Sequence, residues 1–313
     1  MATLHSGQVP SGPNPGILPP IHDLLTAARK LTLPTWALII GILAIAVPTM
    51  VSVARETWST EQGGHGPIVF ATGLWLLARQ WPSIESVRKP GSTWVVALAL
   101  GILVPLYVLC RITAIVEIEG YVMYAAVLTV LYGWIGGAAM RLLWFPLFYL
   151  AFMLPPPETV VALVTQPLKI AISQWAIALL YWVGYPIGGA GVTIQIGQYQ
   201  LLVAAACSGL NSLISLFALS LFYVYMRHRL HWQYAMMLVL VIIPIAIFAN
   251  FVRVIILILL THYQGEAVAQ GFMHNFAGLV MFMIAMLTIF LVDVVAYPIW
   301  TRFHPEENHD DRP

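Results

Sequence analysis

Long apolar segments constrain the fold of this chain more than any other feature. A helix needs about 20 apolar residues to cross about 30 Å of hydrocarbon, because each residue adds about 1.5 Å of length. The apolar residues form blocks without polar alternation, which favours α-helices and excludes an outer-membrane barrel. The sequence therefore predicts an all-α, polytopic membrane helical bundle with about eight transmembrane helices: residues 34–54, 66–80, 93–111, 119–135, 142–154, 208–226, 234–261 and 275–297.

The composition excludes several classes of protein. Of the 313 residues, 60% are hydrophobic and 9% are charged, whereas a soluble domain carries about 25% charged residues. The formal net charge of +1 provides no basic face to neutralise phosphates, so we expect no nucleic-acid partner. The two cysteines form neither a CxxC pair nor a disulfide framework. No ligand spacing for a metal is present, and we expect neither a metal nor an organic cofactor.

Polar segments flank the apolar region at both ends. Residues 1–30 include a stretch rich in Pro, Gly and Ser, which predicts a disordered cytoplasmic tail. Residues 304–313 are polar and acidic and predict a second cytoplasmic tail. Between them, residues 31–303 show no repeat and predict a single transmembrane domain.

The basic residues predict the orientation, because Lys and Arg accumulate on the cytoplasmic side of a membrane. If the N-terminus is inside, ten of the 14 basic residues lie inside. The other four lie outside: Arg55, Arg111, Lys169 and Arg253. We therefore predict a multi-pass protein with both termini in the cytoplasm.

Two segments between the fifth and sixth predicted helices need separate interpretation. Residues 158–184 follow three prolines and are long enough to cross, but a crossing would move Arg227 and Arg229 to the outside. We therefore predict an interfacial or re-entrant helix there. Residues 188–206 contain apolar residues that alternate with polar ones, which predicts a short external β-hairpin.

Three reactive side chains fall at the external ends of predicted helices. Cys207 opens the helix that begins at Ser208, where the positive end of the helix dipole stabilises a thiolate. Arg253 lies about 29 Å along the outward-running helix from Tyr234. His274 directly precedes the last helix, and a neutral imidazole there can exchange protons near physiological pH. Cys207, Arg253 and His274 are thus the candidate catalytic residues.

Each candidate also has a structural interpretation. A membrane cysteine is usually a small buried hydrophobe, which is how we interpret Cys110. Arg253 could instead extend to the lipid headgroups, although Asn250, three residues earlier on the same face, favours a polar site. His274 could cap the last helix. His65 lies in a turn rich in glycine and proline, where structural positioning is as good an explanation as a supporting role.

The other titratable residues suggest less. Asp293 lies near the cytoplasmic end of the last helix, and Glu117 and Glu119 lie in a tight external turn. No carboxylate pair occurs deep in the bilayer, which weakens the case for a proton pump. Three histidines are expected to be solvated: His228, His231 and His262.

Three short segments match, in order, the Cys, Arg and His motifs of a known family. They are AAACSGL at 204–210, ANFVRV at 249–254 and HNFAG at 274–278. The GHGP near His65 and the LPPPE at 154–158 extend the match. In these motifs the chain resembles the exosortases, membrane-embedded transpeptidase-like proteins of Gram-negative bacteria within the exosortase/archaeosortase superfamily. The resemblance covers roughly residues 35–297.

The resemblance implies a role for each candidate residue. Cys207 would be the nucleophile, Arg253 would stabilise the oxyanion or pair with the thiolate, and His274 would be the acid and base. Beside these, we assign Asn250 and Ser208, together with His65, to substrate binding or support.

The resemblance also implies a substrate class and a location. The substrates would be secreted proteins with a C-terminal sorting signal of the PEP-CTERM kind, which combines a Pro-Glu-Pro-like motif, a hydrophobic helix and a basic tail. The site would face the periplasm from the inner membrane, in a process linked to exopolysaccharide export. The alternative is a transporter or polysaccharide-assembly component without peptidase activity, in which Arg253 and Asn250 would bind anions and Cys207 would be incidental.

Overall fold

The structure is a computed structural model that divides the chain into two units, Met1–Ile45 and Ala46–Pro313. In the first unit the described residues form the beginning of one helix, and all further elements belong to the second unit. Both predicted tails, 1–30 and 304–313, lie outside the described residues. The described residues are 33–59, 63–191, 193–202, 211–228, 231–272 and 278–303.

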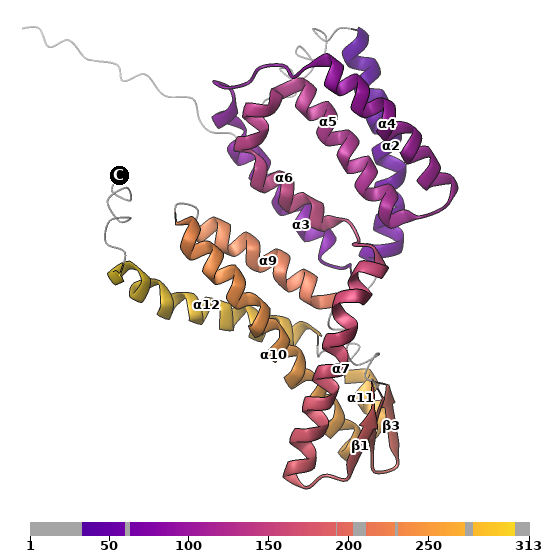
Figure 1. Ribbon diagram of the computed structural model, residues 1–313, viewed down its shortest axis with the longest axis vertical. Helices are drawn as coiled ribbons and strands as arrows, with labels where there is room; N and C mark the ends of the chain where they lie inside the picture. Colours follow the sequence, from indigo (N-terminus) through magenta and orange to yellow (C-terminus); the bar gives the residue numbers. More distant parts are fainter. Residues whose placement is uncertain are drawn as a thin grey trace, which may run out of the picture. The chain divides into compact units, whose positions relative to one another are not determined.

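Helices account for most of the described residues (Figure 1). The N-terminal helices are α2 (Leu33–Val53), α3 (Gly66–Gln80), α4 (Thr93–Ile112), α5 (Val116–Leu142) and α6 (Trp144–Leu150), with a 3-10 turn at Ala151–Met153 after α6. The elements that follow are α7 (Glu158–Val183), β1 (Ile187–Ala190), β2 (Thr193–Ile196), β3 (Tyr199–Leu202), α9 (Asn211–Arg227), α10 (Trp232–Gln264), α11 (Glu266–Phe272) and α12 (Gly278–Phe303). The predicted all-α membrane bundle is confirmed, and one small sheet lies where the sequence predicts a hairpin.

Six helices in the described part of the chain are long and apolar enough to cross a membrane: Trp36–Trp58, Thr93–Ile112, Val116–Leu142, Thr159–Val183, Gln233–Gln264 and Met286–Phe303. Five of these correspond to predicted transmembrane helices, and the sixth is α7. The other predicted segments form the shorter helices α3, α6 and α9, with 15, 7 and 17 residues. The chain is therefore a multi-pass membrane protein.

The helix α7 is continuous from Glu158 to Val183 although Pro167 lies inside it. The preceding proline run explains where α7 begins, because proline lacks the backbone N–H that a helix would use. Gly184 ends α7 with a φ of 100°, which glycine adopts without strain. A continuous helix of this length can cross a bilayer, so its placement as an interfacial or re-entrant helix stays a prediction.

The predicted hairpin is a three-stranded antiparallel sheet, in the order β1-β2-β3. The central strand pairs through Ile194 with Gly189 on one side and with Leu201 on the other. Ile194 and Ile196 are fully buried, as the alternation in the sequence predicts. The sheet packs beside α7, and β3 contacts α10 (Figure 1).

Three helices near the C-terminus form one packed group, since α10 contacts both α9 and α12, and α9 also contacts α12. Their shared core is an apolar cluster made of Leu216, Val224, Tyr234, Leu238, Ile242, Ala246 and Ile289. A second apolar cluster joins the further half of α10 to α7, the sheet and α11, and its α10 members are Val254, Leu257 and Ile258. The helix α10 thus connects two cores.

An ion pair between the exposed Arg111 and the buried Glu119 fixes the start of α5. Glu119 is 1% exposed and accepts hydrogen bonds from Arg111 at 2.8 Å and from Thr49 at 2.7 Å. The Thr49 and Tyr107 hydroxyls lie 3.0 Å apart. These contacts join the end of α2 to α4 and α5, and Glu119 lies buried in the first turn of α5 rather than in the tight external turn that the sequence suggests.

Candidate active site

Arg253 and Asn250 lie buried on α10, each 5% exposed. Residues three apart share one face of a helix, so the two polar side chains belong to the same part of the surface of α10. An arginine that extended to the headgroups would leave its charged end accessible. The burial therefore favours an internal polar site over anchoring in the headgroups.

The two residues lie where the two apolar clusters meet along α10. Ala246 belongs to the cluster shared with α9 and α12, whereas Val254 belongs to the cluster shared with α7 and the sheet. A guanidinium is costly to bury in an apolar core and normally faces a partner or a cavity. The position of Arg253 between two cores, with Asn250 beside it, is typical of a functional site.

At the other end of the group formed by α9, α10 and α12, the Asp293 carboxylate on α12 accepts hydrogen bonds from the other two helices. It accepts bonds from Tyr223 on α9 at 2.6 Å and from Tyr234 on α10 at 2.8 Å. The His228 Nε2 lies 2.7 Å from Asp293 Oδ1, and the Arg227 Nε lies 3.9 Å from Asp293 Oδ2. We call these five residues the Asp293 network.

The Asp293 network sets the register of the three helices. Ser220 bonds to Met286, and Tyr223, further along α9, bonds to Asp293, further along α12, so α9 and α12 run in the same direction. The network also joins the end of α9 to the start of α10, so α10 runs in the opposite direction. At about 1.5 Å per residue, Asn211 at the start of α9 lies about 24 Å from Arg227 at its end, and Gly278 at the start of α12 lies about 23 Å from Asp293. The same length of α10, measured from Tyr234, reaches Asn250. Both helices therefore begin near the level of Asn250, with Arg253 about one turn beyond.

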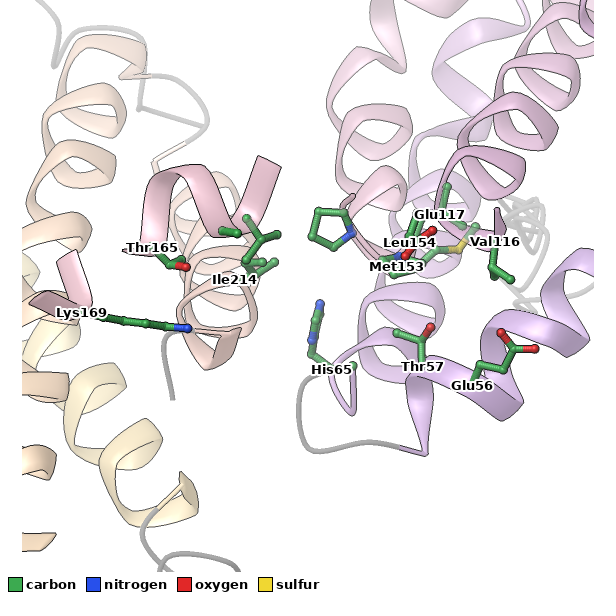
Figure 2. A pocket seen from close by; sticks show the side chains of 15 residues that line it. Glu56, Thr57, His65, Val116, Glu117, Met153, Leu154, Thr165, Lys169 and Ile214 are labelled. Atoms are coloured by element: carbon green, nitrogen blue, oxygen red, sulfur yellow. The ribbon is translucent and has the colours of Figure 1, made fainter. Parts of the chain in front are cut away.

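A cavity of about 540 Å³ lies among the ends of several helices (Figure 2). His65, which is half-buried, is one of its polar residues. The lining residues are Glu56, Thr57, Gly63, His65, Val116, Glu117, Met153, Leu154, Pro155, Pro156, Val161, Ala162, Thr165, Lys169 and Ile214. The turn around His65 and the Leu-Pro-Pro segment thus line one space.

The wall of the cavity near His65 is held in place by Trp58. Its indole N–H donates to the carbonyl oxygen of Met153 at 3.0 Å, which ties the π-helical turn Ala54–Trp58 after α2 to the turn after α6. Gly63 and Gly66 are needed here, because a Cβ at Gly63 would overlap Thr57 and a Cβ at Gly66 would overlap the Trp58 ring. The glycines of this turn therefore serve close packing.

The charges of the cavity lie on opposite sides (Figure 2). Lys169 and Thr165 come from α7, whereas Glu56 comes from the π-helical turn Ala54–Trp58 after α2 and Glu117 from the first turn of α5. Within the described residues, Lys169, Glu56 and Glu117 form no ion pair. No group of three or more His, Cys, Asp or Glu side chains in the described part of the chain is arranged to hold a metal ion.

The model of the transmembrane exosortase family matches residues 57–291. This chain belongs to the transmembrane exosortase family. Comparison with curated proteins and with solved structures gives no match. The family comprises membrane-embedded cysteine peptidases and transpeptidases that act on secreted proteins with sorting signals.

Three of the predicted site residues of this exosortase lie outside the described residues: Cys207, Ser208 and His274. In the sequence, Cys207 precedes Asn211 by four residues, and His274 precedes Gly278 by four. The described residues bring Arg253 and Asn250 together on α10 and place His65 at the cavity. The roles of all six residues stay predictions.

Two histidines of the exosortase differ from the expectation that they are solvated. His228 is 2% exposed and His231 is 7% exposed. His228 is buried because it contacts Asp293 and packs against Tyr234, with ring centroids 4.6 Å apart. Burial lowers the pKa of His228 from its ordinary value, although Asp293 acts in the opposite direction. Cys110 is buried, as predicted.

Proposed function

We propose that this exosortase uses a cysteine nucleophile to cleave the C-terminal sorting signals of secreted proteins and transfers the product to an acceptor or to water. The site would face the periplasm from the bacterial inner membrane and would serve exopolysaccharide export. The observation that carries the proposal is the burial of Arg253 and Asn250 at the level where α9 and α12 begin. The two segments that immediately precede these helices in the sequence contain Cys207 and His274.

The proposed reaction begins at Cys207. Its thiolate attacks the carbonyl carbon of the scissile peptide bond to give a tetrahedral intermediate, whose oxyanion Arg253 stabilises. One such donor typically contributes about 3 to 4 kcal/mol. Ser208 and Asn250 support the site by hydrogen bonding.

His274 then completes the exchange. It protonates the departing amine, so that the C–N bond breaks and a thioester to Cys207 remains. It afterwards takes a proton from the acceptor, which attacks the thioester carbonyl and releases Cys207. The cleaved helix stays in the membrane, because its hydrophobic segment is as long as the bilayer is thick.

The proposed orientation places both termini in the cytoplasm. It is supported by the ratio of ten basic residues inside to four outside. Arg227, which belongs to the Asp293 network, would then lie at the cytoplasmic end of α9, and Arg253 at the opposite end of the three-helix group.

The test is the replacement of Cys207 in cells that express a periplasmic reporter ending in a Pro-Glu-Pro-like motif, a hydrophobic helix and a basic tail. Cys207→Ala should abolish the decrease in reporter mass on an immunoblot, because no other group in the proposed site can form the thioester. Cys110→Ala is the matched control, since Cys110 is the other cysteine of the chain and is buried in α4. The control should process the reporter at the normal rate.

Full processing by Cys207→Ala would contradict the proposal and favour a transporter or assembly component. Alkylation of thiols from the periplasmic side provides a second measurement. It should stop processing in the wild type and in Cys110→Ala alike.

A further inference from the structure

The cavity described above carries charges that the described residues do not neutralise. Lys169, on α7, is half-buried, and Glu117 on the opposite wall is also half-buried. Neither forms an ion pair within the described residues. A partly buried charge loses hydration, and a partner of the opposite sign restores the lost free energy. The cavity is thus complementary to a ligand that brings its own charges.

The size and the walls of the cavity suit a short peptide segment. Its volume of about 540 Å³ falls within the range of about 300 to 1,000 Å³ for ligand pockets. Leu154, Val161 and Ala162 add apolar surface, and Pro155 and Pro156 form a stiff rim. A mixture of apolar surface and a few placed charges is typical of a site that fixes one orientation of its ligand.

The position of the cavity along the length of α10 can be compared with that of the proposed active site. Trp175 on α7 packs against Phe251 on α10, with ring centroids 6.5 Å apart, and the hydroxyl of Tyr185, just past the end of α7, lies 2.8 Å from that of Tyr263 near the end of α10. The helices therefore run in the same direction. Lys169 precedes Trp175 by about 9 Å along α7. It therefore lies level with a point on α10 about two turns before Phe251.

A second lining residue of the cavity indicates a similar position along α10. Ile214, in the first turn of α9, also lines the cavity. The start of α9 lies near the level of Asn250, as the register of the three helices shows. A ligand in the cavity would therefore lie near the level at which α9 begins, and α9 begins four residues after Cys207 in the sequence.

We infer that this cavity binds the polar peptide segment of the substrate that precedes its hydrophobic helix, and that Lys169 pairs with a carboxylate side chain of that segment. This inference rests on the proposed function. Glu56 and Glu117 line the opposite wall. They repel a second acidic group there, so the cavity selects a segment with a carboxylate at one end only. Lys169 is thus a specificity-determining residue.

Substitutions that reverse the charge at Lys169 in the enzyme and at the Glu in the substrate test the inference. The probe is a periplasmic reporter with a short polar segment containing one Glu, followed by a hydrophobic helix and a basic tail. A second reporter carries Lys in place of that Glu. The enzymes are the wild type, Lys169→Gln, Lys169→Glu and, as a matched control, Arg55→Gln. Arg55 is an exposed cation next to Glu56 in the sequence, and it does not line the cavity.

The wild type should process the Glu reporter faster than the Lys reporter, and Lys169→Gln should process the Glu reporter about tenfold more slowly. Lys169→Glu should reverse the preference and process the Lys reporter faster than the Glu reporter. That reversal cannot arise from misfolding, because misfolding slows both reporters alike. Arg55→Gln should behave as the wild type does.

The possible failures are distinguishable. Processing that depends on Cys207 but is unaffected by Lys169→Gln, or a Lys169→Glu enzyme that keeps the original preference, would overturn the inference alone. Processing of the Glu reporter that persists in Cys207→Ala would overturn the proposed function and this inference with it.

Discussion

Two groups of charged residues in this exosortase differ in whether the protein itself supplies their partners. The Asp293 carboxylate is 2% exposed and is satisfied by the protein itself, through Tyr223, Tyr234 and His228. Glu117 and Lys169 at the cavity form no ion pair among the described residues, although both are half-buried. The first group holds helices together, whereas the second remains available to a ligand.

The difference has a physical basis in hydration. A buried carboxylate without partners is strongly destabilising, so Asp293 is tolerated only because donors surround it. A charge at an open cavity keeps part of its water until a ligand replaces it. Stability should therefore depend on the Asp293 network and substrate preference on the cavity.

The largest expected effect on stability comes from Asp293→Ala. The substitution removes the acceptor shared by two tyrosines and a histidine, and we expect the free energy of unfolding to fall by about 3 to 5 kcal/mol. Thermal unfolding in detergent measures the change. Val295→Ala is the control, because Val295 lies on the same helix and is 64% exposed. It should unfold at nearly the wild-type temperature.

The Asp293 prediction also separates stability from specificity. The fraction of Asp293→Ala that remains folded should keep the wild-type preference between the Glu and Lys reporters, since Asp293 lies at the other end of the three-helix group. A stable Asp293→Ala protein, or one with a changed substrate preference, would remove the distinction between the two groups.

Much of the fold could be predicted because the thickness of the bilayer determines helix length. The sequence predicts the segment 66–80 with the bounds that α3 has, and the alternation in 188–206 predicts a hairpin where the structure has the three strands β1 to β3. The third strand was not separated from the other two, because short strands carry little periodicity. The pairing of His228 with Asp293 joins residues far apart in the sequence, and nothing local to either residue indicates it.

The candidate site, like the fold, could be predicted only in part from the sequence. Asn250 and Arg253 are close in sequence on one helix, so their shared face could be predicted, and their burial supports it. The cavity combines residues from α5 and α7 with the turns around Glu56 and His65, and only packing brings these together. Lys169 could be recognised as a polar residue in a largely apolar helix, but its opposition to Glu117 could not.

A pair of neighbouring glutamates gives an intermediate effect. Glu119 is buried and paired with Arg111, whereas Glu117, two residues earlier, lines the cavity. Glu119→Gln should lower the free energy of unfolding by about 1 to 3 kcal/mol, because a charge-assisted hydrogen bond becomes a neutral one. Glu117→Gln is the matched control, with the same chemical change.

Thermal unfolding in detergent compares the two variants directly. Glu117→Gln should unfold near the wild-type temperature and should instead accept the reporter segments with less discrimination, since one repulsive carboxylate is gone. Equal destabilisation by both substitutions would mean that the exposure of the two positions does not determine their roles.

The smallest expected effect is a dependence of stability on pH through His228. Burial lowers the pKa of His228 in the folded protein from its ordinary value of 6.5, so the unfolded protein binds the proton more readily. The stability that comes from neutral His228 is complete above about pH 6.5 and is lost as the pH falls from there toward the lowered pKa. Asp293 opposes this shift, while Arg227 and His231 add to it, so the net effect should be modest.

Unfolding temperatures measured between pH 7.5 and pH 5.5 test the sign. The wild type should lose stability on acidification, and His228→Gln should lose less, because glutamine can donate a hydrogen bond to Asp293 without titrating. The Lys169 variants should follow the wild-type curve, since Lys169 lies at the cavity and is not a member of the Asp293 network. A wild type that gained stability at the lower pH would show that His228 is held as a cation by Asp293, and the network would then be an ion pair whose strength grows on protonation.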